Sequence, residues 1–434
     1  MFANPLTAVV VGAGHRAVVY SSYAHWHPDE LRIVGVADPD DFRRSQFAES
    51  HDIPPERRYR TAEELAAAGP FADFAINGTM DPQHVPTSLP LLDAGYHLLL
   101  EKPFATSEGE LWQLVDAARR NERTVGICHV LRFAPFYAAV RARVAEGAIG
   151  QVLNVQTVEH VSYHHMAVAF VRGKWNRVDR CGSTMLMSKC CHDLDLIVWM
   201  KSGVRPTAVA SFGDLTYFCP ERAPENAGTR CLVDCPIEAE CLYSARKHYI
   251  DHPNRWAFYV WQPLEHIPNP TIEDKIASLQ GDNPYGRCVW KCDNDVVDHQ
   301  SLTVTFADGA TATHDMVGGA AKPSRSIHLL GTEGEIQGNF EDSRFVIRHI
   351  DPRPGHETAE EVVDLKIGGD MHGAAGGHGG GDLRLVGDFL RVVRGEEPSL
   401  STTTLDDSIY GHLLGFCADR SREEGRIVEI RTAE

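Results

Sequence analysis

The sequence predicts an α/β protein in which a doubly wound parallel sheet is followed by an α+β domain with a large open antiparallel sheet. Up to about residue 130, apolar strand-like segments alternate with amphipathic helices, as in βαβ units. Beyond that point, polar and apolar residues alternate in segments joined by Gly, Asp and Asn turns, which is typical of antiparallel sheets. A chain of 434 residues also exceeds what one core usually supports. We therefore expect two domains, at 1–130 and 131–434.

The first domain is predicted from five short segments of mainly β-branched, small or apolar residues, as found in strands that are covered on both faces. Residues 107–121 have the apolar spacing of an amphipathic helix. The expected strands are residues 8–11, 32–37, 74–77, 97–100 and 124–129.

The second domain is predicted to contain strands at residues 152–159, 301–306, 310–314, 325–330, 335–338 and 345–349. A segment at about 217–290, rich in Pro, Cys and aromatic residues, interrupts them as an insert with weak periodicity. The glycine-rich residues 368–381 are expected to form a mobile loop before a helix at 383–394. An open antiparallel sheet commonly finds a partner, so we expect a homo-oligomer.

Composition excludes several classes of partner. The 42 basic and 60 acidic residues give a net charge of −18 at pH 7, which argues against binding to nucleic acid or an anionic membrane surface. The sequence has no apolar run that approaches the roughly 18 residues of a membrane span. Eleven cysteines, an odd number, suit a reducing compartment better than a disulfide framework. We therefore expect a cytoplasmic protein.

A glycine-rich turn follows the first predicted strand. The run Gly12-Ala-Gly14-His15-Arg16-Ala17 has the spacing of the dinucleotide-binding turn of a Rossmann domain. Its glycines let the backbone turn sharply into a helix, whose N-terminal amides and dipole favour a pyrophosphate. Ala17 is the third small residue, which permits close packing of helix against strand. These residues are candidate cofactor contacts, and an ordinary strand-turn-helix without a ligand is the alternative.

Asp38 follows the second predicted strand. A carboxylate at this place can accept hydrogen bonds from both ribose hydroxyls of NAD. Because its charge would repel the extra phosphate of NADP, NAD is the expected cofactor. Arg43 and Arg44 close by leave NADP as the alternative.

The run Glu101-Lys102-Pro103 ends another apolar segment. Lys102 lies at the carboxyl end of a predicted parallel strand, where ligands of open α/β sheets bind. A lysine at such a site can take part in proton transfer; a solvated surface lysine is the alternative. The two motifs together predict a dinucleotide site with Lys102 beside it.

Residues 184–199 contain no Pro or Gly and are predicted to form a helix. An imidazole with a pKa near neutral pH is suited to act as a base, so His192 is a candidate catalytic residue. A buried structural histidine is the alternative. Helical spacing puts four polar side chains on adjoining parts of one face: Ser188, Lys189, His192 and Asp195.

As a set, these motifs resemble the Gfo/Idh/MocA family of sugar oxidoreductases over nearly the whole chain. The resemblance implies an N-terminal Rossmann NAD-binding domain, a C-terminal domain for substrate and oligomerisation, and a carbohydrate site in the cleft between them. It rests on Gly12 to Ala17, Thr79-Met-Asp81-Pro-Gln-His84, Glu101-Lys102-Pro103, Arg132-Phe133 and the helix around His192. The family pattern places four residues beside the cofactor: Thr79, His84, Glu101 and Lys102.

The resemblance also implies catalytic roles. Lys102 would reach the nicotinamide ribose and a substrate hydroxyl, His192 would be the catalytic histidine, and Asp195 would orient its ring. The family often has an aspartate four residues before this histidine, where the present chain has Ser188 followed by Lys189. A cation at that place suggests an anionic substrate group, or a different division of the proton transfers between Lys102 and His192.

Two enzymatic functions follow from these residues. The first is an NAD-dependent oxidoreductase that moves a hydride between a carbohydrate ring carbon and nicotinamide, with Lys102 and His192 handling the proton. The second, similar to some relatives of the family, is an NAD-dependent glycoside hydrolase that oxidises the ring transiently, eliminates the aglycone, adds water and returns the hydride. That route needs a second base, for which Lys189, His164 or His378 would serve. A cofactor-binding sensor without catalysis is a minor alternative.

Several basic, aromatic and histidine residues are candidate substrate contacts. Trp175 could stack on a sugar ring while nearby cations hold an anionic substituent; a solvated basic loop is the alternative. Asp382 is placed to cap a helix, and with His378 it could close over the cleft on the glycine-rich loop. The candidates are Arg172, Lys174, Trp175, His164, His378 and Asp382.

The insert contains a group of cysteines at short spacings. Thiolates in a Pro-rich segment with few core-forming residues could bind a structural zinc ion. The spacings differ from the common C-x-x-C pattern, so free buried cysteines are the alternative. The candidate ligands are Cys231, Cys235 and Cys241.

Overall fold

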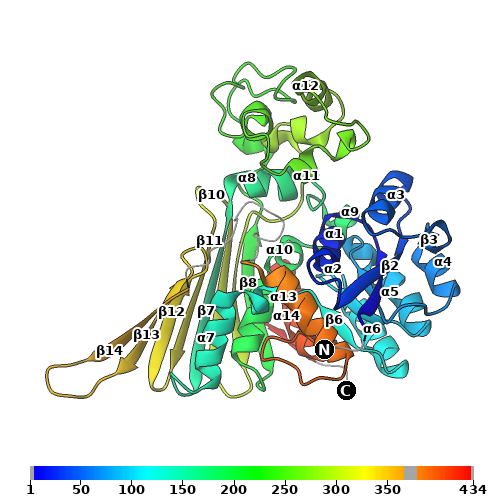
Figure 1. Ribbon diagram of the computed structural model, residues 1–434. Helices are drawn as coiled ribbons and strands as arrows, with labels where there is room; N and C mark the ends of the chain where they lie inside the picture. Colours follow the sequence, from blue (N-terminus) through cyan, green and yellow to red (C-terminus); the bar gives the residue numbers. More distant parts are fainter. Residues whose placement is uncertain (1–3, 366–378, 432–434) are drawn as a thin grey trace.

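The computed structural model describes residues 4–365 and 379–431 and contains two sheets with helices between them (Figure 1). One sheet has six strands in the order β3-β2-β1-β4-β5-β6. The other has nine, in the order β14-β13-β12-β11-β7-β10-β9-β8-β15. The predicted fold class is therefore confirmed. Most of the predicted glycine-rich loop lies outside the described residues.

The six-stranded sheet is parallel throughout, and its order reverses between β1 and β4, where ligands of doubly wound folds bind. All five predicted strands are present, whereas β3 is too short to give a periodic signal in the sequence. The strands are β1 (Leu6–Val11), β2 (Leu31–Ala37), β3 (Arg58–Tyr59), β4 (Phe74–Asn77), β5 (His97–Leu100) and β6 (Val125–Ile127). The helices are α1 (His15–Ser21), α2 (Tyr23–Trp26), α3 (Asp41–Ser50), α4 (Ala62–Ala67), α5 (His84–Asp93) and α6 (Glu108–Arg120).

Helix α13 (Gly381–Val393) returns from the far end of the sequence to cover this parallel sheet. Its Phe389 packs edge-on against Phe74 of β4, with ring centroids 5.2 Å apart. Phe389 also fills the space over Gly126, where an added Cβ would lie 2.6 Å from its ring. A boundary at residue 130 therefore separates α13 in sequence from the sheet on which it packs.

The nine-stranded sheet is mixed, because β7 and β10 pair in parallel while the other pairs are antiparallel. Strands β12 to β14 extend away from the body of the molecule (Figure 1). The strands are β7 (Val152–Ser162), β8 (Pro206–Asp214), β9 (His299–Phe306), β10 (Thr311–Ala320), β11 (Ser324–Gly331), β12 (Gly334–Asn339), β13 (Arg344–Ile350), β14 (Thr358–Asp364) and β15 (Val428–Glu429).

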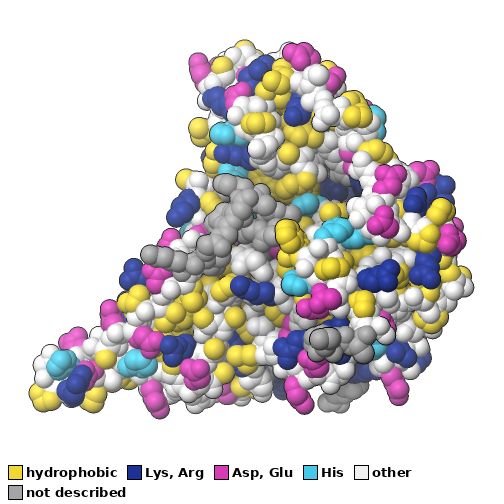
Figure 2. All heavy atoms as spheres, in the orientation of Figure 1, with side chains coloured by type: hydrophobic (Ala, Val, Ile, Leu, Met, Phe, Trp, Pro, Cys, Tyr) yellow, Lys and Arg dark blue, Asp and Glu magenta, His cyan; other side chains and the backbone are white. Residues whose placement is uncertain are grey.

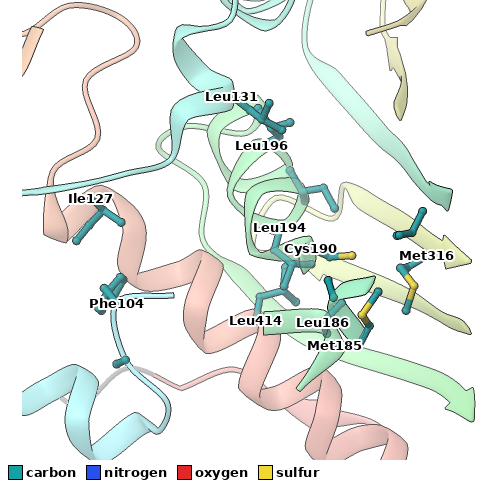
Figure 3. Close-up of a cluster of buried hydrophobic side chains, with 14 of the residues drawn as sticks. Phe104, Ile127, Leu131, Met185, Leu186, Cys190, Leu194, Leu196, Met316 and Leu414 are labelled. Carbon is teal, nitrogen blue, oxygen red and sulfur yellow. The ribbon is translucent and has the colours of Figure 1, made fainter. Parts of the chain in front are cut away.

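Helices α10 (Met185–Met200) and α14 (Leu405–Glu424) pack against each other between the two sheets (Figure 1). Figure 3 shows Leu186, Cys190 and Leu194 of α10 beside Leu414 of α14, with Phe104 from the loop after β5 nearby. All five side chains are completely buried. The core that holds α10 is therefore built from both halves of the chain.

The insert forms a lobe above α8 (Tyr163–His165) at the end of β7 (Figure 1). Its regular structure is sparse, as the weak periodicity predicted. Two of its segments, around Arg230 and Arg287, meet in one antiparallel bridge. Its helices include Arg246–Ile250, α11 (Ala257–Val260) and α12 (Ile272–Gln280). The domain also contains α7 (Pro135–Ala145) and α9 (Val178–Cys181).

None of the helices in the described ranges combines the length and the apolar character needed to cross a bilayer.

Replacing Gly12 with Ala tests the turn that follows β1. Gly12 has φ +79°, and an added Cβ would lie 2.9 Å from the backbone nitrogen of Thr79. We expect G12A to lower the free energy of unfolding by about 2–4 kcal/mol in chemical denaturation, because left-handed strain and a backbone clash add together. Gly69 has φ +81° but nothing within 4 Å, so G69A should cost only about 1 kcal/mol. Equal losses in the two variants would show that Thr79 does not crowd this position.

Candidate active site

The candidate site lies at the carboxyl ends of the parallel strands, where this edge of the sheet meets α10 and the insert. Figure 2 shows histidine and charged side chains of both signs along the junction between the insert and the parallel-sheet domain. The strand ends of a doubly wound sheet are its usual ligand-binding edge. Both sequence motifs that predicted a cofactor fall on this edge.

The glycine-rich turn has the geometry that its sequence predicted. Gly12 adopts φ +79° and donates its N–H to the carbonyl of Ala37 at the end of β2. Gly14 is the N-cap of α1 and offers no side-chain acceptor to the helix amides. Ala17 packs so closely on Gly78 that a Cβ on Gly78 would lie 2.9 Å from that of Ala17. The helix therefore begins close to the strand ends, with its amide end facing the ligand-binding edge.

Asp38 is held rigidly at the end of β2. Its Oδ2 accepts from the N–H of Ala13 at 2.7 Å and its Oδ1 from the N–H of Asp40 at 2.8 Å. The residue is 6% exposed. Two backbone donors thus fix the carboxylate where a ribose diol would meet its remaining lone pairs.

The two arginines after Asp38 are both engaged in this structure. Arg43 forms a forked ion pair with Glu265 of the insert, with its Nη2 2.8 Å from Oε1. Arg44 pairs with Asp41 and donates to the backbone carbonyl of Asp38 at 2.6 Å. Neither guanidinium is therefore held open for a ribose phosphate.

Arg16 joins three elements. Its Nε donates to Glu101 at 2.8 Å, and its Nη2 contacts Tyr20 and forms an ion pair with Asp382 in the first turn of α13. Burial opposes ionisation of Glu101, but the neighbouring Arg16 and Lys102 cations lower its pKa to about 2. The N-cap of α13 is Gly380, so the expectation that Asp382 caps this helix is wrong. Its carboxylate is buried against Arg16 instead.

His84 ties together the two loops that border the site. One ring nitrogen lies 3.0 Å from the carbonyl of Thr79, after β4, and the other 2.7 Å from the carbonyl of Pro103, after β5. Thr79 is itself held by Asn77 at 2.8 Å. His84 is 1% exposed. It therefore shapes the loops, and any contact with a cofactor is indirect.

Lys102 spans the two halves of the protein. Its Nζ donates to the carbonyl oxygen of Ser188 in α10 at 2.9 Å, and its backbone N–H donates to Glu101 at 2.8 Å. His192 follows Ser188 by one helical turn and is 4% exposed. The Lys102 ammonium thus contacts α10 one helical turn before His192.

His129 also belongs to this region, and the sequence analysis did not single it out. Its ring centroid lies 5.9 Å from that of His192. It is 1% exposed, and neither ring nitrogen has a hydrogen-bond partner among the described residues. Burial, with Arg132 and Lys102 nearby, lowers the pKa of His129 well below its usual range. Its place just after β6, at the same sheet edge as Lys102, was the available signal.

Two polar residues of α10 have other partners than those expected. Lys189 forms an ion pair with Glu159 of β7, with 3.0 Å between Nζ and Oε1. Asp195, which we expected to orient His192, forms a bidentate pair with Arg132, with distances of 2.8 and 2.6 Å. Both charges are thus committed to fixing α10, because a buried charge requires a partner.

The basic segment after α8 separates into different environments. Arg172 is 1% exposed and lies inside the insert, where it binds the carbonyls of Arg287 and Tyr243 at 2.7 and 2.8 Å. The expectation that Arg172 grips substrate is therefore wrong, because its donors are used within the core. Trp175 donates its Nε1–H to Asp81 at 3.2 Å, across to the parallel-sheet domain. Burial and Arg43 lower the pKa of Lys174.

Aromatic residues of the insert form a wall over the site. The ring of Phe258 stacks on His15 with centroids 4.1 Å apart, and Tyr259 meets Trp175 edge-on at 5.8 Å. Trp256 donates its Nε1–H to Nδ1 of His164 at 2.9 Å. This wall was not predicted from the sequence. The available signal was three aromatic residues within four positions, Trp256, Phe258 and Tyr259. His378, a further candidate, lies outside the described residues.

Comparison with known proteins gives consistent matches. A family model described as the NAD-binding Rossmann fold of an oxidoreductase family, Gfo/Idh/MocA, matches residues 6–129, and the model of its C-terminal alpha/beta domain matches residues 141–430. The chain is 25% identical over 372 residues to the oxidoreductase YteT of Bacillus subtilis, covering 82% of each.

Solved structures share the fold. The WlbA dehydrogenase from Bordetella pertussis, in complex with NADH and UDP-GlcNAcA, has a TM-score of 0.67 at 14% identity over 100% of both chains. A levoglucosan dehydrogenase in complex with NADH and levoglucosan has a TM-score of 0.68 at 15% identity, over 99% of this chain and 100% of that one.

The buried His129 predicts an acid-sensitive stability. Because its pKa is lowered in the folded state, the unfolded chain binds the extra proton below about pH 6.5 while the native state does not. We expect this residue alone to reduce the free energy of unfolding by up to about 1.4 kcal/mol per pH unit as the pH falls from about 6.5.

The measurement is the unfolding free energy of wild type and H129Q between about pH 7.5 and about pH 5.5. The wild type should lose more stability than H129Q over this range. Subtracting the unfolding free energies of the two proteins removes the contribution of groups that titrate in both. Asp419 is one of these, because burial raises its pKa to about 6. H356Q, which alters an exposed ring on the far sheet, should follow the wild type. Parallel curves for wild type and H129Q would contradict the assignment.

Proposed function

Since the chain belongs to the Gfo/Idh/MocA oxidoreductase family, we propose that it moves a hydride between a carbohydrate ring carbon and NAD, with Lys102 and His192 handling the proton. The observation that carries this proposal is the 2.9 Å contact between the Lys102 ammonium and the Ser188 carbonyl, one turn before His192. This contact supports the proposal because it links Lys102, from the parallel-sheet domain, to the helix that carries His192. Two neighbours of the same fold hold NADH together with a carbohydrate ligand.

The residues present fit NAD. The amide end of α1 begins at Gly14 without a side-chain cap, as a pyrophosphate requires, and Asp38 is fixed at the ribose position by two backbone donors. Bound NAD would supply the hydride acceptor. The negative charge of Asp38 would repel a ribose phosphate. Arg43, which could bind such a phosphate, is already in an ion pair with Glu265. We therefore propose NAD over NADP.

The chain's own groups would divide the remaining work. Lys102 can donate a hydrogen bond to the oxygen of the substrate hydroxyl and hold it in place, while the His192 imidazole accepts its proton. Loss of that proton from the hydroxyl oxygen, and of a hydride to NAD from the carbon that bears it, would leave a carbonyl. Glu101 is ionised and paired with Arg16. It accepts a hydrogen bond from the backbone N–H of Lys102 and so fixes the start of this loop.

The cations around these groups favour an uncharged substrate. Three of them are already paired with carboxylates, so an anionic substituent at these positions would have to displace an existing partner. We therefore propose a neutral carbohydrate in place of the anionic group that Lys189 suggested. The pairs are Lys189 with Glu159, Arg132 with Asp195, and Arg325 with Asp193.

The hydrolase alternative requires a second base. Lys189 is held by Glu159. His164 accepts from Trp256, and burial with Arg255 nearby lowers its pKa to about 4. These contacts favour the oxidoreductase. Turnover of an aryl glycoside with NAD present, without NADH release and with uptake of solvent deuterium into the ring, would contradict our proposal.

Variants at the two central residues test the reaction. With NAD and a panel of neutral sugars and sugar acids, the wild type should produce NADH, and K102M and H192N should each reduce kcat by about 10²–10⁴-fold. Binding of NAD to H192N, measured by calorimetry, should change by less than about threefold, because the imidazole acts on the substrate. K322M and H356N change exposed residues away from the site and should retain wild-type kcat. Full activity in either K102M or H192N would remove that residue from the mechanism.

The ion pair between Arg43 and Glu265 predicts cofactor preference. In E265Q the guanidinium is released and can meet a ribose phosphate, so we expect the Kd for NADP to fall by about tenfold at low salt while that for NAD changes little. Titration calorimetry of both cofactors measures the ratio. E273Q alters an exposed acid on α12 of the same insert and should leave the ratio unchanged. An unaltered ratio in E265Q would show that Asp38 alone sets the preference.

A further inference from the structure

Four cysteines of the insert line one cavity. Cys231, Cys235, Cys241 and Cys288 surround it, with Trp290 as part of its apolar wall. The cavity has room for a water-sized body. The first three cysteines are close in sequence, whereas Cys288 comes from the other end of the insert. The candidate zinc ligands predicted from the sequence were the first three.

The backbone brings the two ends of the insert together at this cavity. Cys231 donates its N–H to the carbonyl of Gly286 at 2.9 Å, and Cys288 donates to Thr229 at 2.9 Å. These bonds flank the bridge between Arg230 and Arg287. The sulfur of Cys241 accepts the N–H of Tyr243 at 3.3 Å. N–H donation to sulfur is the outer-shell support that metal-bound ligands receive.

A buried positive charge next to the cavity forms no ion pair with a carboxylate of residues 4–365 or 379–431. Arg172 is 1% exposed, and its guanidinium donates to two carbonyls, the Tyr249 hydroxyl and the sulfur of Cys231 at 3.6 Å. An uncompensated buried charge is costly. The arrangement therefore calls for negative charge on the cysteine side of Arg172.

We propose that Cys231, Cys235, Cys241 and Cys288 bind one zinc ion as thiolates. Binding releases the four thiol protons, and zinc held by four thiolates is a dianion that compensates the buried charge of Arg172. Neutral thiols would leave that charge unmet, and all eleven cysteines are free of disulfides in this structure. In this structure no three of these sulfur atoms lie within 4.8 Å of one another. To reach a distance of about 2.3 Å from the ion, the four side chains must therefore turn inward from their positions around the cavity.

A second group of metal-type ligands is less suitable. Among the described residues, three ligand atoms lie within 4.8 Å of one another in Cys190, Asp193 and His314. The Asp193 carboxylate is already bound by Arg325 at 3.0 Å. Nδ1 of His314 contacts Thr157 at 2.9 Å. These contacts occupy the Asp193 carboxylate and one nitrogen of the His314 ring, whereas the four cysteines of the insert line a cavity.

A zinc ion in this cavity would join the two ends of the insert, the lobe that lies beside the cofactor edge. The insert reaches the parallel-sheet domain through Phe258 on His15 and Glu265 on Arg43. Its regular structure consists of short helices and one bridge. Four bonds that join the two ends of the insert would supply the missing rigidity.

Metal analysis of the full-length protein tests the proposal independently of activity. Protein purified without chelators from medium containing zinc and iron should carry about one zinc per chain by inductively coupled plasma mass spectrometry. A mercurial that modifies thiols should release this zinc to a colorimetric indicator. Growth with cobalt should give the intense sulfur-to-cobalt charge-transfer absorption of thiolate sites.

Variants identify the ligands. C241S and C288S should lower the bound zinc at least fivefold. C219S is the matched control, because Cys219 lies in the same insert but outside the cavity, with its thiol on the Thr216 carbonyl. It should keep the wild-type zinc content. If the ligand variants fail to fold, zinc release and the cobalt spectrum of the wild type still decide the question. Wild-type protein without zinc, or with iron and acid-labile sulfide in its place, would overturn the proposal.

Discussion

The burial of α10 is the constraint on which the rest of the site depends. Every residue of this helix except Lys189 is buried, although the helix carries two aspartates and a histidine. A buried carboxylate must be paired, and each aspartate holds an arginine from a different part of the fold: Asp193 binds Arg325 of β11, and Asp195 binds Arg132 after β6. Two guanidinium groups from two directions thus fix the rotation of the helix and its position along its axis.

That fixed position determines what the proposed catalytic groups can reach. Lys102 meets α10 at the Ser188 carbonyl because the helix lies close to the end of β5. Small residues of α14 permit this approach, since a Cβ on Gly415 would lie 2.2 Å from the sulfur of Met187. A larger side chain there would displace α10. The distance between the ammonium and the imidazole is thus controlled by residues that touch neither substrate nor cofactor.

The sequence predicted the parts of the fold and site that depend on local pattern. The turn at Gly12, the end of β5 at Lys102 and the helix around His192 each follow from neighbouring residues, and each lies where it was expected. The partners of buried charges could not be found in this way. Arg172 looked like part of a basic surface segment. In the fold it is buried, and it donates to the carbonyl of Tyr243, 71 residues away. Nothing local to a guanidinium or a carboxylate indicates which distant group will neutralise it.

The same limit explains why the insert was underestimated. Its weak periodicity was correctly interpreted as sparse regular structure, which suggested an appendage. In the fold it borders the cofactor edge, because Phe258 covers His15 and Glu265 holds Arg43. These two side-chain contacts join the lobe to the rim of the cofactor site. A change at Arg172 or the cysteines that shifts the lobe would therefore alter this rim through Phe258 and Glu265.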